Sequence, residues 1–124
     1  MKRYAIAAQA YSAVAKKTGN PRELEADLLL DAAARLQAVR DSWESRRSEL
    51  DAALVNNRRL WSIFVTSATS TDNPLPKSVR ENVANLGLFV FKQTMMVLID
   101  PKPDNLVSLI NINRELAAGL RGGA

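Results

Sequence analysis

The sequence contains no cysteine and no histidine. Their absence excludes disulfide bonds, thiolate catalysis, zinc sites built on cysteine or histidine, and histidine-dependent catalytic triads. The acidic residues are scattered through charged segments and do not form pairs in an apolar, glycine-rich setting. Solvated carboxylates of this kind do not indicate general acid–base catalysis. The sequence therefore predicts no enzyme activity, no cofactor and no metal site.

Glycine and proline are also scarce, with five of each, and neither occurs between Arg22 and Asp72. One continuous helix over that range would be about 75 Å long. A compact domain of this size has a radius of gyration of only about 14 Å. We therefore expect a helix break between Ser42 and Ser48, where Ser48 followed by Asp51 has the spacing of a helix-starting cap.

The predicted fold is all-α, a single domain over residues 1–124 that forms an antiparallel helical bundle of about five helices. The hydrophobic content of 47% against 24% charged residues is ordinary for a globular protein. Gly19 is expected to end the first helix, and Pro74 and Pro76 to separate the third from the fourth. The expected helices cover about residues 3–17, 21–45, 49–70, 76–99 and 103–120.

Asn57 lies in the middle of the apolar face of its helix, four residues before Trp61. Asn113 likewise lies in the middle of the apolar face of the last helix. A buried amide is unfavourable unless its hydrogen bonds are made. We expect the two asparagines to fix the helix register by bonding to each other or to the backbone. Direct contact with a ligand is the alternative. Trp61 is predicted to be buried and structural.

The helix expected over residues 76–99 is apolar on nearly all sides, which indicates a central position or a second face for a partner. Gly87 lies between its two apolar rows, where a neighbouring helix can come close. Phe89 and Met96 lie off both rows, on a stripe that also holds Asn85. Methionine and aromatic side chains suit binding to an amphipathic helix, so these residues are candidate partner contacts, and Met95 belongs to the same surplus of apolar surface. Membrane insertion is not expected, because polar residues interrupt an apolar run of marginal length.

The net charge is +4 and the sequence pI is about 9.8. Acidic residues are interleaved with the basic ones in the middle of the chain, which indicates a solvated helix surface; a nucleic-acid patch is the alternative. Arg58, Arg59 and Arg114 adjoin the two central asparagines and are candidates to frame a partner-binding groove. No long apolar segment with a cleavage site follows Met1, so we expect a cytoplasmic protein.

Several segments of the chain together resemble the FlaF family of alphaproteobacterial flagellar biosynthesis regulators. The resemblance covers nearly the whole chain and is strongest from Leu54 onward. The segments that carry it are the stretch 56–76, Asn82-Val-Ala-Asn85-Leu-Gly87, Phe89-Val90, Pro101-Lys-Pro103, Leu109-Ile-Asn-Ile-Asn113-Arg114 and Ala117-Ala-Gly119-Leu120.

The resemblance implies a flagellin-binding secretion chaperone and a positive regulator of flagellin synthesis and flagellum assembly, which acts alongside the regulator FlbT. Such a chaperone would cover the amphipathic terminal helices of flagellin, whose apolar faces otherwise promote aggregation. The alternative is an RNA-level regulator that contacts the flagellin transcript or acts with FlbT. RNA is the less favoured partner, because Trp61 is the aromatic residue near an arginine pair and its spacing places it in the core.

Overall fold

The computed structural model describes residues 21–122, and these residues form helices joined by short turns, with no strand among them. The predicted all-α fold is therefore confirmed. Four long helices account for most of the described residues. The helix expected over residues 3–17 and the break expected at Gly19 lie outside them. The elements in chain order are α2 (Pro21–Asp41), α3 (Trp43–Arg46), the 3-10 turn η1 (Arg47–Glu49), α4 (Leu50–Ala68), α5 (Lys77–Ile99), the 3-10 turn η2 (Pro103–Leu106) and α6 (Val107–Leu120).

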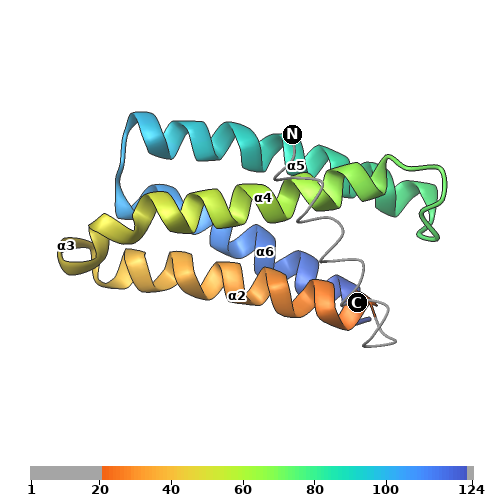
Figure 1. Ribbon diagram of the computed structural model, residues 1–124, viewed down its shortest axis with the longest axis horizontal. Coiled ribbons are helices and arrows are strands. Elements are labelled where there is room, and N and C mark those ends of the chain that lie inside the picture. The colour runs from red at the N-terminus through yellow and green to blue at the C-terminus, as the bar shows by residue number, and fades with distance from the viewer. Residues whose placement is uncertain (1–20, 123–124) are drawn as a thin grey trace.

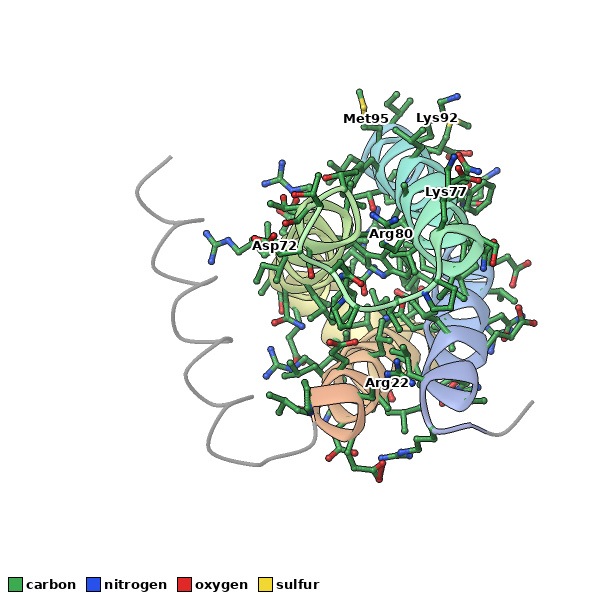
Figure 2. All side chains as sticks on the ribbon, turned by 90° about the vertical axis from the view of Figure 1, so that its right-hand side faces the viewer. Arg22, Asp72, Lys77, Arg80, Lys92 and Met95 are labelled. Atoms are coloured by element: carbon green, nitrogen blue, oxygen red, sulfur yellow. The ribbon has the colours of Figure 1, made fainter. Side chains whose placement is uncertain are left out.

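The four long helices lie side by side in an antiparallel arrangement, with short connections at the two ends of the bundle (Figure 1). Helix α4 lies between α2 and α5 and packs on both, while α6 packs chiefly on α2. Seen end-on, the helices occupy the corners of a four-sided bundle (Figure 2). Helices α5 and α6 touch each other only sparsely. Helix α5 therefore depends mainly on α4 for its position.

The predicted break in the middle of the chain is present, because α2 ends at Asp41 and α4 begins at Leu50. The cap predicted at Ser48 is wrong. Ser48 lies inside η1, and no side chain caps the start of α4. The backbone serves instead, since the N–H group of Leu50 donates to the carbonyl oxygen of Arg47 in the 3-10 turn. Local i→i+3 bonding of this kind satisfies helix-end groups without a capping side chain.

The connection between α4 and α5, residues 69–76, is held by Asn73. Its Nδ2 group donates to the carbonyl oxygen of Ser67 at 3.1 Å and to the Ser67 hydroxyl at 3.0 Å. Its Oδ1 atom accepts from the backbone N–H of Leu75 at 2.9 Å. Pro76 then precedes the first residue of α5, as its fixed φ angle favours. The stop predicted for this region is confirmed.

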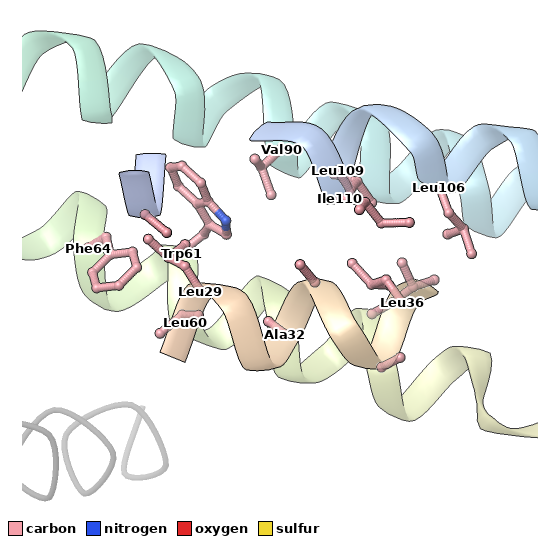
Figure 3. Close-up of a cluster of buried hydrophobic side chains, with 14 of the residues drawn as sticks. Leu29, Ala32, Leu36, Leu60, Trp61, Phe64, Val90, Leu106, Leu109 and Ile110 are labelled. Carbon is pink, nitrogen blue, oxygen red and sulfur yellow. The ribbon is translucent and has the colours of Figure 1, made fainter. Parts of the chain in front are cut away.

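The core lies between α2, α4 and α6, which supply the large buried side chains (Figure 3). Fully buried large residues of these helices and of η2 are Trp61, Leu29, Leu36, Leu54, Leu106, Leu109 and Ile110. Helix α5 buries only small or β-branched residues: Val83, Gly87, Val90, Thr94 and Val97. Leu86 and Phe91 are partly buried against the core, and the other large apolar side chains of α5 are exposed.

Candidate functional site: the outer face of α5

All of the large apolar side chains that stand exposed within residues 21–122 belong to one helix, α5. Contiguous exposed apolar surface of this kind marks an interaction site in proteins. We call this surface the outer face of α5. It consists of Leu88, Phe89, Met95, Met96, Leu98 and Ile99, whose exposed fractions are 58%, 44%, 63%, 54%, 56% and 75%.

The outer face has two apolar stripes. Successive residues of a helix turn by about 100°, so Leu88, Met95 and Leu98 fall to one side of the helix and Phe89 and Met96 to the other. The polar residues Asn85 and Lys92, seven residues apart, lie between the two stripes and are exposed. Figure 2 shows Lys92 and Met95 pointing away from the bundle.

The inner side of α5 is held against α4 at Gly87. A Cβ atom at this position would lie 2.2 Å from Cγ2 of Val65 and 3.7 Å from Cε3 of Trp61. Glycine is therefore required for this close approach of the two helices. The contact fixes the rotation of α5 about its axis and turns the six large side chains outward.

An open groove of about 610 Å³ lies between α5 and α6, beside the stripe that holds Phe89. Apolar side chains from both helices line it, including Leu86, three residues before Phe89, and Ile112 and Leu116 of α6. These side chains are half-buried. The apolar surface of α5 thus continues from the outer face into a depression.

The asparagines expected in the core form a fully buried hydrogen-bond network with Trp61. Nδ2 of Asn113 donates to Oδ1 of Asn57 at 2.7 Å and to the carbonyl oxygen of Leu29 at 3.2 Å. Nε1 of Trp61 donates to Oδ1 of Asn113 at 2.9 Å. The network joins α2, α4 and α6, and the three side chains are 0% exposed. Within the described residues, only Nδ2 of Asn57 in this network has no hydrogen-bond partner.

The three candidate arginines do not share one site. Arg114, exposed on α6, donates from Nη2 to Oε1 of Gln37 on α2 at 3.3 Å, so it lies at the contact between those helices. Arg58 is exposed and stands two turns before Val65 on the α5-facing side of α4. Arg59 is half-buried on α4. Of the three, Arg58 is the one whose helix position brings it toward α5.

The other sequence-derived candidates fall in two places. Asn85, Phe89 and Met96 are exposed on α5 together, as a partner contact requires, while Pro74 and Pro76 are exposed in the connection before it. The sequence interpretation counted Met95 with Phe89 and Met96 as surplus apolar surface, but it did not single out Leu88 and Leu98, which continue an apolar row of the helix. Side-chain size is the sequence signal that identifies the side of α5 facing the bundle. Apart from Gly87, the buried residues on that side are valine and threonine.

Helix α5 is also, within residues 21–122, the helix that is long and apolar enough to cross a membrane. A single helix that meets criteria of length and composition alone is weak evidence for a membrane segment. Among the described residues, no group of three or more metal-ligating side chains lies close enough together to hold a metal ion. The chemistry available at the outer face is therefore apolar contact around one lysine.

The chain matches the model of a known protein family. The family model described as "Flagellar protein FlaF" matches residues 7–120 of the chain. The matched range includes the whole of α2 to α6 and the outer face of α5. No curated protein and no solved structure matches the chain significantly.

Proposed function

The chain belongs to the FlaF family of flagellar proteins, and we propose that it is a cytoplasmic secretion chaperone that binds flagellin and promotes flagellin synthesis and flagellum assembly. The observation that carries the proposal is the outer face of α5, with its six exposed apolar side chains. We place the flagellin contact on this surface. FlbT is a further partner in the proposed regulation.

An amphipathic helix is the partner that fits this surface. Such helices dock their apolar side chains, spaced three or four residues apart, into apolar surfaces of helical proteins. From Leu88 to Ile99 the outer face runs about 17 Å along α5, which matches roughly three turns of a docked helix. Methionine and phenylalanine provide an adaptable contact area. Before assembly, the terminal helices of flagellin would need cover for apolar faces of this type.

The test is isothermal titration of the full chain with separate N-terminal and C-terminal helical segments of the flagellin from the same organism. We expect one segment to bind, and Phe89→Asp, Met95→Asp and Met96→Asp each to weaken binding, since a carboxylate on an apolar contact must be desolvated. Ala34→Asp, which places the same charge on the exposed surface of α2, is the matched control. Unchanged affinity in all three α5 variants would show that flagellin does not dock on this face.

Direct RNA binding through the basic residues of this net-positive chain is the competing function. Its affinity would fall steeply with salt, because phosphate contacts release counterions, whereas apolar docking of flagellin would change little. Trp61 is 0% exposed and so cannot stack on a base. The expectation that it is the aromatic residue near an arginine pair is wrong, because the half-buried Trp43 lies beside Arg46 and Arg47, with the Arg47 guanidinium 5.4 Å from its ring centroid. Titration of the flagellin transcript at two salt concentrations separates the functions: salt-sensitive RNA binding that survives the three α5 substitutions would favour the RNA-level role.

A further inference from the structure

Lys92 occupies the centre of the outer face of α5. Residues three or four positions apart are neighbours on a helix surface. By this spacing, the side chains one turn before and one turn after Lys92 are those of Leu88, Phe89, Met95 and Met96. All four are exposed and apolar. A single cation is therefore surrounded by the most extensive apolar surface of the described bundle.

On α5 itself, the charge of Lys92 stands alone in the middle of the helix. Between Asn82 and Ile99 no other residue of α5 is charged. Within residues 21–122, no ion pair involves Lys92, although other lysines of the same region do form pairs. Lys77 pairs with Glu81 at 3.8 Å, for example. Lys92 is thus available to a group supplied by another molecule.

A helix that docks across both apolar stripes must cover Lys92. Removing an ammonium group from water without a partner is strongly unfavourable, whereas a carboxylate placed against it offsets much of that cost. The geometry points to a partner helix that carries an aspartate or glutamate within its apolar face, opposite Lys92. This inference rests on the proposed function and specifies the flagellin helix that the outer face of α5 selects.

Such a charge pair would mainly determine which partner helices bind to the outer face of α5. Complementary charges at the centre of an interface fix the register of the partners and reject helices that place a like charge or an apolar residue there. An amphipathic helix with an uninterrupted apolar face would leave the ammonium group covered and unpaired. The lysine therefore distinguishes a helix with a central carboxylate from the many amphipathic helices of a cell.

The experiment compares three substitutions in the full chain by titration with the flagellin segment that binds wild-type protein. Lys92→Glu is expected to lower affinity about 30-fold or more, because the two carboxylates then face each other. Lys92→Met is expected to lower it about 10-fold, since the carboxylate of the partner loses its counter-charge. The matched control is Lys77→Glu, which makes the same charge change on the first turn of α5 and should alter affinity less than 3-fold.

The reciprocal substitution completes the test. One aspartate or glutamate of the flagellin segment, replaced by lysine, should restore binding to the Lys92→Glu protein. The inference is overturned if Lys92→Met binds as tightly as wild type, or if no acidic position of the segment restores binding. Met95→Asp separates the two proposals. If it weakens binding while Lys92→Met does not, only the charge pairing fails; if Phe89→Asp, Met95→Asp and Met96→Asp all leave the affinity unchanged, flagellin docking on this face fails.

Discussion

Nδ2 of Asn113 lies 2.7 Å from Oδ1 of Asn57, and this hydrogen bond joins residues 56 positions apart on α6 and α4. Both side chains are fully buried. Because Asn113 also bonds to Trp61 and to the backbone of Leu29, a single amide serves three helices. Polar networks that are buried in this way favour one register of the helices over its alternatives.

Substitution of Asn113 by alanine should cost about 3 kcal/mol or more of unfolding free energy. It leaves the indole N–H of Trp61, Oδ1 of Asn57 and the carbonyl oxygen of Leu29 without this partner, and each unsatisfied buried group costs about 1–3 kcal/mol. Urea denaturation measures the change. Asn111→Ala, an exposed position on the same helix, should change stability by less than about 0.5 kcal/mol. Equal effects of both substitutions would contradict the role of the network.

Trp61→Ala should destabilise the protein by about 3–5 kcal/mol, as a large truncation of the core does. Trp61→Phe should cost less, because it keeps an aromatic side chain and loses the hydrogen bond to Asn113. Thermal unfolding followed by circular dichroism ranks the two variants. If Trp61→Ala retained wild-type stability and lost flagellin binding, the side chain would belong to the interface and not to the core.

Gly87→Ala should destabilise the contact between α4 and α5 by about 1–3 kcal/mol, since the new methyl group meets the stiff side chain of Val65. The double variant Gly87→Ala with Val65→Ala should recover part of the loss. Gly119→Ala is the matched control, because a Cβ there meets no atom within 4 Å. That substitution in α6 should stabilise the protein by up to about 1 kcal/mol through helix propensity. Chemical denaturation measures all three.

Arg121 bridges the end of α6 to the start of α2, pairing with Glu23 at 3.3 Å and with Asp27. The groups are partly exposed, so Arg121→Ala should cost less than about 1 kcal/mol. The difference should shrink as salt is added, because exposed charges are screened. Unfolding curves at low and high ionic strength provide the measurement. A loss that is large and independent of salt would show a packing role for the arginine stem.

Local signals and chain length together predicted the breaks between the described helices. Pro74 and Pro76 disfavour helix in the residues before α5. The break at residues 42–48 followed from the length that one continuous helix would need in a compact domain. The short turn before α4 was not predictable in detail, because its start is held by a backbone hydrogen bond that leaves no mark in the side chains. Local patterns also indicated the central positions of Asn57 and Asn113, since both interrupt an apolar face.

The site was only partly predictable. Phe89 and Met96 stood out because they fall off the apolar rows of their helix, and both are exposed. Leu88 and Leu98 did not stand out, since an apolar row has the same spacing whether it faces the core or the solvent. What decides between the two is the close contact of Gly87 with Val65, a relationship between distant parts of the chain. The periodicity of one helix therefore cannot show which of its apolar rows faces the core.

The small residues on the inner side of α5 have a consequence for motion. A helix that buries valine, threonine and glycine gains less from the hydrophobic effect than its neighbours, which bury leucine and tryptophan. Segments with fewer buried contacts open more readily, and their amide protons exchange sooner with solvent. In the free protein, α5 is therefore the long helix expected to show the weakest exchange protection. A partner bound on its outer face would slow that exchange, so the amide exchange rates of α5 would provide a direct measure of binding.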